Sequence, residues 1–302
     1  MAAFQDYLGK YPDAWSARYE LSQILMSLKQ LDMAETQLQA AILTAPRQAA
    51  LWSRLGQVYL LQADLENAER ALRNARDLDG TDAGVHYNLG RLFEKLGRDP
   101  EALSEYLAFL SLAPGDERAS GVRKRVANHY ENSNQPDAAI EQYRLLCGLE
   151  PSRLEYHQSL ADLLYRKAAY DEANEEYQRV LSLDPNSSSA HFNVGFIAKM
   201  KGRLEEAEQS LMTADQLSPG STKTLYTLAA VRFDRGNYAG AIPDLERVIA
   251  AEPDHPQAHY YLSRSLAKLG RLDEAKKELL IHQEILRKVR QQDSVPSTMG
   301  GD

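Results

Sequence analysis

The sequence predicts an all-α protein built as an α-solenoid of about eight helical hairpins. The first observation is a period of 34 residues, at which proline recurs along the chain. Glycine replaces proline once, and one interval is 37 residues long. The second is that small and large apolar residues recur at fixed offsets from these positions. A period of this length indicates that one supersecondary unit is copied and that neighbouring copies bury a common core. The recurring residues, called anchors here, are Pro12, Pro46, Gly80, Pro114, Pro151, Pro185, Pro219 and Pro253.

Each unit is expected to hold two amphipathic helices, A and B. Leu51, Leu55 and Val58 share one face at i, i+4 and i+7, which is the spacing of a helix. In helix A an apolar residue precedes a small one, as in Leu55-Gly56, and helix B carries alanine with a large residue four positions later. The small residues should let the helices approach closely, and the large residue should fill the space between units. The pairs in helix B are Ala34 and Leu38, Ala68 and Leu72, Ala102 and Tyr106, Ala139 and Tyr143, Ala173 and Tyr177, Ala207 and Leu211, Ala241 and Leu245, and Ala275 and Leu279.

The period also predicts the domain organisation. Residues 1–12 indicate the remnant of a preceding repeat or an N-terminal cap, because Phe4 and Pro12 have the separation of Tyr177 and Pro185. The last helix B is expected to run from Asp273 to about Gln292 as a capping helix, so that residues 289–302 hold its end and a disordered tail. The array itself covers 13–288, in units at about 13–45, 46–79, 80–113, 114–150, 151–184, 185–218, 219–252 and 253–288.

Three departures from the period carry predictions. The unit at 114–150 is three residues longer, which predicts a change of pitch and a seam between the third and fourth units. Gly80 replaces proline and should loosen that turn slightly. Pro243 lies inside a helix B, so we expect that helix to be kinked and less stable. The turn after helix A needs a left-handed residue, which glycine or asparagine supplies at Gly97, Asn134, Gly202, Gly236 and Gly270.

The pattern Trp52-x2-Leu55-Gly56-x2-Tyr59, followed by Ala68-x3-Leu72, resembles the tetratricopeptide repeat (TPR) signature. Eight units in phase make the resemblance specific, and they cover most of the chain. The resemblance implies a right-handed superhelix, with A helices lining a concave groove and B helices on the convex side. Two specialised templates of the family, a carboxylate clamp and an asparagine ladder, are not reproduced here.

Composition and motifs exclude several classes of function. The net charge of −8 disfavours a nucleic-acid partner, and the single Cys147 excludes an intramolecular disulfide. The sequence lacks GxSxG, GxxxxGK[ST], HExxH and GxGxxG, so we expect no enzyme activity and no cofactor. His255 and His259 have a metal-ligand spacing, but two ligands alone make a weak site, and no metal is expected. Four histidines stand at the family's tryptophan position and are interpreted as packing substitutes: His86, His157, His191 and His259.

Positions seven residues after an anchor should face the groove, and many of them are aromatic. Aromatic side chains give a large contact area at low entropic cost and are enriched in binding hot spots. The alternative is that some of them pack against the neighbouring helix A. The aromatic candidates are Tyr19, Tyr87, Phe192, Tyr226 and Tyr260, with Phe196 one turn from Phe192.

A basic segment with interspersed amides accompanies them on the A helices of units two to four. Arginine binds carboxylates bidentately, and asparagine can hold a peptide backbone. We expect this half of the groove to prefer acidic groups and the aromatic half to prefer apolar ones. Scattered arginines on a solvated face are the competing interpretation. The polar candidates are Arg54, Asn88, Arg91, Lys124, Arg125 and Asn128, with Arg123 beside them and Asn193 in the aromatic half.

The predicted function is a non-enzymatic scaffold that binds a peptide or protein segment in the groove. Alternatives are the substrate-recruiting arm of a larger glycosyltransferase or protease, or an envelope assembly factor. With no apolar leader at its start the chain is expected to be cytoplasmic, although a fragment of a longer protein could be periplasmic. The last helix is basic and amphipathic, so a cap, a membrane-surface helix and a docking helix all remain open, with membrane contact not expected.

Overall fold

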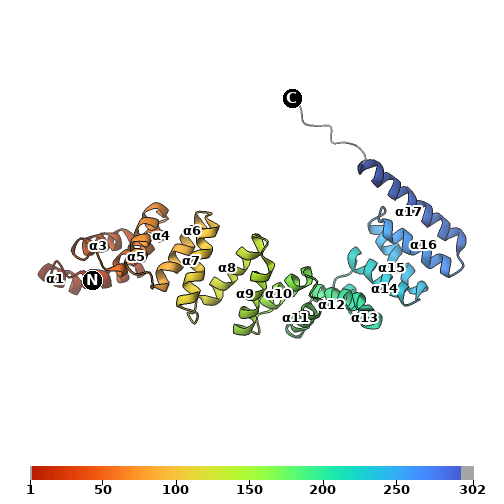
Figure 1. Cartoon of the computed structure of the whole chain (residues 1–302), viewed down its shortest axis with the longest axis horizontal. Coiled ribbons are helices and arrows are strands. Elements are labelled where there is room, and N and C mark those ends of the chain that lie inside the picture. Colours follow the sequence, from red (N-terminus) through yellow and green to blue (C-terminus); the bar gives the residue numbers. More distant parts are fainter. Residues whose placement is uncertain (1, 294–302) are drawn as a thin grey trace, which may run out of the picture. The chain divides into compact units, whose positions relative to one another are not determined.

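The computed structural model describes residues 2–293, and within that range the chain consists of helices joined by short turns, with no strand (Figure 1). The all-α class predicted from the period is confirmed. None of the helices in this range is long and apolar enough to cross a bilayer. The chain forms two compact units, Met1–Leu149 and Glu150–Asp302. The division follows the fourth hairpin, one hairpin later than the predicted seam.

The first compact unit is a stack of four hairpins preceded by one helix. Each helix packs against the helices before and after it, so that A and B helices alternate through the stack (Figure 1). Its helices are α1 (Ala2–Lys10), α2 (Trp15–Ser27), α3 (Leu31–Thr44), α4 (Ala49–Gln62), α5 (Leu65–Leu78), α6 (Ala83–Lys95), α7 (Asp99–Leu112), α8 (Ala119–Asn132) and α9 (Pro136–Leu149).

The second compact unit holds the other four hairpins. Helix α15 continues through Pro243, and its first turn is capped by the Asn237 side chain, which accepts a hydrogen bond from the Gly240 backbone nitrogen. The predicted disordered tail from Ser294 lies outside the described residues. The helices are α10 (Leu154–Arg166), α11 (Tyr170–Leu183), α12 (Ser188–Met200), α13 (Leu204–Leu217), α14 (Thr222–Asp234), α15 (Tyr238–Ala251), α16 (Pro256–Lys268) and α17 (Leu272–Asp293).

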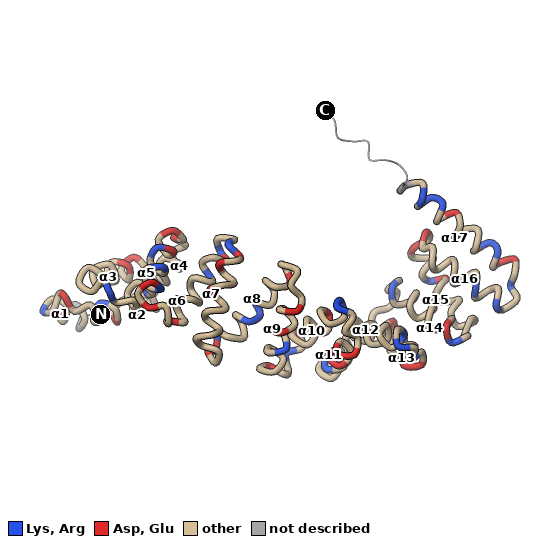
Figure 2. The backbone as a smooth tube through the Cα atoms, viewed as in Figure 1, with Lys and Arg blue, Asp and Glu red and all other residues tan. Residues whose placement is uncertain are grey.

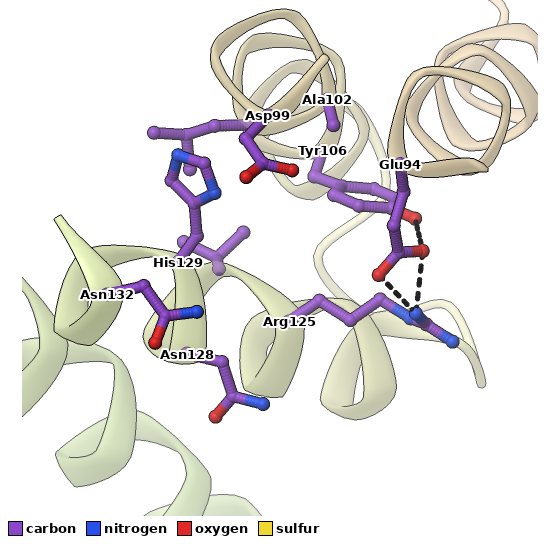
Figure 3. A pocket seen from close by; sticks show the side chains of 10 residues that line it. Glu94, Asp99, Ala102, Tyr106, Arg125, Asn128, His129 and Asn132 are labelled. Carbon is purple, nitrogen blue, oxygen red and sulfur yellow. Dashed lines mark hydrogen bonds and ion pairs between the residues drawn. The ribbon is translucent and has the colours of Figure 1, made fainter. Parts of the chain in front are cut away.

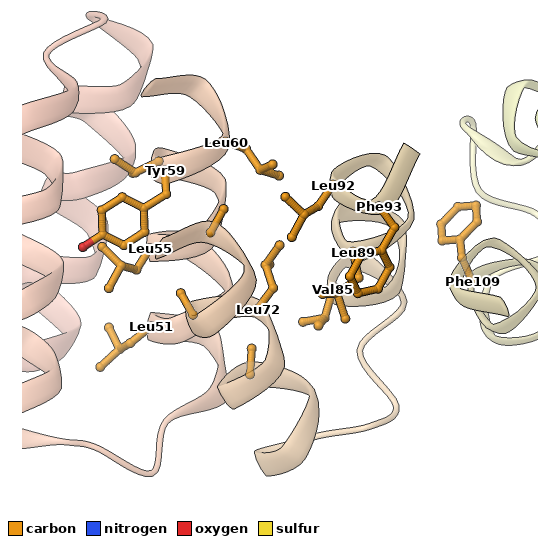
Figure 4. Packing of buried hydrophobic residues seen from close by; sticks show 14 of the residues in the cluster. Leu51, Leu55, Tyr59, Leu60, Leu72, Val85, Leu89, Leu92, Phe93 and Phe109 are labelled. Atoms are coloured by element: carbon orange, nitrogen blue, oxygen red, sulfur yellow. The ribbon is translucent and has the colours of Figure 1, made fainter. Parts of the chain in front are cut away.

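The core is built where a small residue of helix A meets a large residue of helix B. A Cβ atom added at Gly56 would come within 2.5 Å of Leu72 Cγ, and one added at Gly90 within 2.5 Å of the Tyr106 ring. Figure 4 shows Leu72 between the A helices of two successive hairpins, among Leu51, Leu55 and Leu89. The close approach of helices that the small residues predict is therefore present.

The turn after helix A has a left-handed residue in all eight hairpins. The predicted residues Gly97, Asn134, Gly202, Gly236 and Gly270 have φ values of 68°, 55°, 72°, 80° and 79°. The other three hairpins place an ordinary residue in the same conformation, at Lys29, Ala63 and Ala168, with φ values of 59°, 62° and 58°. The geometry of the hairpin therefore imposes this conformation even where a side chain makes it costly.

In six of the eight described hairpins the residue at the family's tryptophan position connects helix A to the anchor. Trp52 Nε1 donates a hydrogen bond to the Pro46 carbonyl at 2.8 Å, and His157 Nε2 donates to the Pro151 carbonyl at 3.1 Å. His157 Nδ1 also lies 2.6 Å from Glu176 Oε2 on helix B. The predicted role as packing substitutes is thus incomplete, because the histidines also form hydrogen bonds. The same anchor bond is made by Arg18, His86, His191 and His259.

The three extra residues of the fourth repeat form an ordered turn before α8. Asp116 Oδ1 accepts hydrogen bonds from the Arg118 backbone nitrogen at 2.8 Å and from Arg118 Nε at 2.7 Å, and Oδ2 accepts from Nη2 at 2.7 Å. These bonds lower the pKa of the Asp116 carboxyl to about 2. The Arg118 guanidinium in turn lies over the rings of Tyr87 and Phe109, at 4.6 and 5.3 Å.

The tight contact at Gly90 gives a first prediction. Gly90→Ala should lower the free energy of unfolding by about 1–3 kcal/mol, because the new methyl group overlaps the Tyr106 ring. Gly121 also lies in a helix A of the first compact unit, but a Cβ atom added there would meet nothing within 4 Å. Gly121→Ala should therefore be neutral or raise the free energy of unfolding by up to about 1 kcal/mol. Urea denaturation followed by circular dichroism measures both. Equal stability of the two variants would contradict the packing described.

The left-handed turns give a second prediction. Ala63→Gly should raise the free energy of unfolding by up to about 1 kcal/mol, because glycine removes the steric cost of positive φ. Gly97→Ala should lower it by a similar amount at the equivalent turn. Thermal unfolding of the pair against wild type tests this, and a destabilised Ala63→Gly protein would show that the backbone conformation is not the deciding factor.

The Asp116 carboxyl gives a third prediction, about pH. Its pKa is lower in the folded chain than its ordinary value of 3.8, so its stabilisation is complete above about pH 4 and is lost as the pH falls towards 2. Asp116→Asn should therefore show a flatter loss of melting temperature than wild type between pH 4 and 2. Glu117→Gln, which removes an exposed neighbouring carboxylate, should keep the wild-type slope; identical slopes for all three proteins would refute the prediction.

Candidate functional site

The candidate site is the set of A-helix side chains expected to contact a partner, called the A-helix face here. Each compact unit carries its own part of this face. In the first unit it comprises Tyr19, Arg54, Tyr87, Asn88, Arg91, Lys124, Arg125 and Asn128, and in the second Phe192, Asn193, Phe196, Tyr226 and Tyr260.

Two residues of successive A helices contact each other at the start of the first unit. Arg54 Nη2 donates a hydrogen bond to the Tyr19 hydroxyl at 2.8 Å, and the guanidinium lies 5.1 Å from the centre of the Tyr19 ring. Both side chains are half-buried. Because no acidic side chain among residues 2–293 pairs with Arg54, its charge is not compensated locally. This part of the face can therefore accept an acidic group.

Tyr87 forms the next contact, and it involves a residue that the sequence analysis missed. Arg118 packs over its ring, and the exposed Arg91 lies 5.8 Å from the ring centre. Phe109 lies on the remaining side, with ring centres 5.5 Å apart. Tyr87 is therefore fixed by packing while it stays half-exposed, and Arg91 provides a second accessible cation.

Arg125 and Asn128 line a hollow of about 260 Å³ between α7 and α8 (Figure 3). Arg125 Nη1 lies 2.7 Å from both carboxylate oxygens of Glu94, and the Tyr106 hydroxyl donates to Glu94 Oε2 at 2.9 Å. Burial, together with the Glu94 charge, raises the pKa of the Tyr106 phenol. Arg125 thus already has an exposed acidic partner in Glu94, and its preference for acidic groups of a partner stays a prediction.

The amides on the face behave differently from one another. Asn88 is only 5% exposed, and its Nδ2 has no hydrogen-bond partner among the described residues. It therefore packs between helices and does not present a contact surface. Asn128 is exposed, but its Oδ1 accepts a hydrogen bond from the Tyr143 hydroxyl at 3.0 Å. Lys124 and Asn193 are half-buried.

In the second unit the aromatic residues of neighbouring A helices pack together. Phe192 and Phe196 have ring centres 6.1 Å apart, and Tyr165 of the preceding helix A lies 6.0 Å from Phe196. Lys223 lies over the Phe192 ring at 4.3 Å. Phe192 is only 7% exposed, so the packing alternative holds for it, whereas Phe196 keeps part of its surface exposed.

A larger aromatic cluster lies on α14 and α16. Tyr261, which the sequence analysis did not single out, contacts Tyr226 and Tyr260 with ring centres 5.8 Å apart in each case, and Phe233 at 5.2 Å. Burial raises the pKa of the Tyr226 phenol. Tyr226 and Tyr260 remain half-exposed, so the cluster holds two aromatic side chains rigidly at the surface.

A buried charge network fixes α14, the helix that carries Tyr226. Arg232 Nε lies 2.9 Å from Glu208 Oε1 on α13, and Arg232 Nη1 lies 2.5 Å from Asp244 Oδ2 on α15. Arg235 also pairs with Glu208. Burial raises the pKa of the Asp244 carboxyl, although the Arg232 charge opposes the shift. The network positions the helix: its carboxylates Glu208 and Asp244 are buried, whereas Arg235 remains exposed.

Charges of both signs are interspersed along the helices of each unit (Figure 2). The A-helix face therefore offers local cations at Arg54 and Arg91 within a chain whose overall charge is negative. It offers aromatic surface at Tyr87, Tyr226 and Tyr260. No arrangement of acid, base and nucleophile on this face indicates a reaction centre among the residues described.

Comparisons with curated proteins find partial relatives. The chain is 27% identical over 124 residues to the general transcriptional corepressor ssn6 of Schizosaccharomyces pombe, which is 40% of this chain and 11% of that protein. It is 25% identical over 130 residues to protein O-mannosyl-transferase TMTC3 of Homo sapiens, which is 39% of this chain and 14% of that protein. The aligned part thus spans a small fraction of either relative.

Solved structures share the fold. The Naa15/Naa10 structure bound to HypK-THB has a TM-score of 0.67 at 14% identity, over 84% of this chain and 39% of that one. The crystal structure of MamA protein has a TM-score of 0.55 at 19% identity, over 62% of this chain and all of that one. Tetratricopeptide repeat models match residues 2–50, 53–117, 154–187, 176–209 and 232–292. The chain therefore belongs to the tetratricopeptide repeat family.

Proposed function

We propose that this chain is a non-enzymatic scaffold that binds an extended or helical segment of another protein on its A-helix face. The observation that carries the proposal is the set of half-exposed aromatic side chains held by packing, above all Tyr226 and Tyr260 on successive A helices. Aromatic side chains that are rigid before binding lose little conformational freedom when a partner covers them, so more of the contact energy appears as affinity.

The two compact units favour different partner chemistry. In the first, Arg54 and Arg91 are cations without an acidic partner among residues 2–293, each beside a tyrosine ring. A carboxylate bound there gains charge-assisted hydrogen bonds, while apolar parts of the same segment can cover the ring. In the second, tyrosine and phenylalanine dominate, so an apolar or aromatic segment fits. These two preferences make more specific the expectation from the sequence that a partner carries acidic and apolar segments.

A second function is a recruiting arm within a larger enzyme. The match to protein O-mannosyl-transferase TMTC3 supports it, because that protein is named as an enzyme and the matched residues make up 14% of its length. The complete coding sequence tests this alternative directly. A catalytic domain in the same reading frame would support it, and a reading frame confined to these repeats would rule it out.

The scaffold proposal predicts separable losses of partner binding. Tyr226→Ala/Tyr260→Ala should reduce capture of an apolar partner at least tenfold, since truncation of a hot-spot residue costs about 2 kcal/mol or more. Arg54→Glu/Arg91→Glu should reduce capture of an acidic partner by reversing both local charges. Affinity capture with quantitative mass spectrometry, using each variant as bait, measures the change.

Matched variants away from the face serve as controls. Met212→Ala removes exposed apolar surface from α13, and Arg70→Glu reverses an exposed charge on α5. Both should capture the same partners as wild type, and circular dichroism should show that every bait is folded. Unchanged capture by both A-helix-face variants would exclude recognition on this face.

A further inference from the structure

Helix α17, the last helix within the described residues, leaves exposed a position that every other hairpin buries. Leu279 of α17 is 38% exposed. The equivalent side chains of the seven preceding B helices are between 0% and 3% exposed. Those seven residues are Leu38, Leu72, Tyr106, Tyr143, Tyr177, Leu211 and Leu245.

The difference follows from what packs on each helix B. Within the units, α3 packs against α4, α5 against α6, and α15 against α16, so each of these B helices lies between its own helix A and the next. Helix α17 packs against α16, where Ser263 donates a hydrogen bond to the Ala275 carbonyl and His259 lies 2.6 Å from Glu278, and no further helix A follows it in the described chain. Its side facing away from α16 is therefore a helix-packing surface without a helix.

The composition of this surface differs from that of an ordinary terminal repeat. Repeat proteins normally end on a polar face, because the open end of the core meets water. Here Leu272, Leu279 and Leu286 recur at intervals of seven residues along α17, and Leu272 is 59% exposed. Between them lie Lys276 and Gln283, and Arg290 continues the line. This row of six residues, spaced alternately by four and three, is called the α17 stripe here.

The charge at one position of the α17 stripe is the reverse of that in three of the seven earlier hairpins, whereas the other four carry Leu103, Ile140, Asn174 and Ile242 there. Lys276 occupies the position of Glu35, Glu69 and Glu208. Each of these glutamates bonds to the following helix A or the turn after it: Tyr59 donates to Glu35 at 3.1 Å, Arg98 lies 2.9 Å from Glu69, and Arg232 lies 2.9 Å from Glu208.

Lys276 has the opposite charge, and neither it nor Arg290 forms an ion pair with any residue whose side chain the structure describes (the basic turns of α17 are visible in Figure 2). A helix that occupied the next position would therefore need acidic residues where α4 and α14 carry hydroxyl, amide or basic groups.

We propose that the α17 stripe binds one amphipathic helix of a partner protein, which takes the place of the next helix A. The partner helix places apolar residues against Leu272, Leu279 and Leu286, and aspartate or glutamate against Lys276 and Arg290. This surface lies on a helix B and is distinct from the A-helix face. A partner can therefore occupy it without displacing a segment bound elsewhere.

A second copy of the chain fits this surface poorly. Two α17 stripes side by side in parallel would oppose Lys276 to Lys276 and Arg290 to Arg290. In the antiparallel arrangement Lys276 would face Leu286, and Arg290 would face Leu272. Like charges and buried unpaired cations both oppose association. The reversed charge thus favours an acidic partner helix over self-association.

The test uses two synthetic peptides of about 18 residues, five turns each, held helical by a staple on the outer side. Both carry a leucine stripe, flanked in one peptide by glutamates and in the other by lysines. The full chain should bind the glutamate helix at least tenfold more tightly by fluorescence anisotropy. Lys276→Glu/Arg290→Glu should invert that preference, whereas Lys277→Glu/Lys288→Glu, an equal charge change on another side of α17, should leave it unchanged.

Further variants separate this proposal from the alternatives. Leu279→Asp should abolish binding of the glutamate helix, and Tyr226→Ala should leave it intact, so failure of the A-helix-face proposal would not affect this result. Equal binding of the two peptides, or a preference that the double charge reversal does not change, would overturn the proposal. It would also be overturned by a wild-type dimer that Leu279→Asp dissociates, or by binding to phosphatidylserine vesicles without binding to the glutamate helix.

Discussion

The close contact between a small residue of helix A and a large residue of helix B is the constraint on which the rest of this structure depends. At Gly90 the backbone approaches the Tyr106 ring so closely that even a methyl group would overlap it. Gly195 has the same relation to Leu211, and a methyl group there would also meet the backbone of α13. Because each hairpin is closed in this way, its A helix takes a definite position. The position of the A helix in turn fixes where the side chains of the A-helix face lie.

Much of the fold could be predicted from the sequence because each hairpin is stabilised by near neighbours. The period located the helices, and the glycine and asparagine turns were confirmed by positive φ values. The same conformation at Lys29, Ala63 and Ala168 was not predicted, because the residues themselves do not favour it and the packing of two helices imposes it. The ordered turn at Asp116 was missed because its stability comes from Arg118 stacking on rings of two other helices.

The candidate site was less predictable than the fold. Whether Arg125 offers a free charge depends on Glu94, which lies 31 residues away and in a different hairpin. Whether Phe192 and Asn88 face solvent depends on how tightly two A helices approach, and both proved to be buried. Tyr261 was overlooked because its neighbour Tyr260 has the expected offset, yet Tyr261 lies at the centre of the aromatic cluster. The offset of a residue from its anchor predicts which side of the helix it lies on. Its exposure and its ion pairs depend on the neighbouring helices, whose positions the offset does not give.

The bond from helix A to the anchor carbonyl has a consequence for how such an array diverges. Indole, imidazole and guanidinium groups all make it, as Trp52, His191 and Arg18 show, because each reaches the same oxygen with a nitrogen donor. Substitution among these three side chains keeps the hydrogen bond and therefore the hairpin geometry, so this position can change its residue type as long as a nitrogen donor remains. Leu225 of the seventh hairpin is the exception, because it is buried at this position without a donor, so the core contact alone can also hold a hairpin.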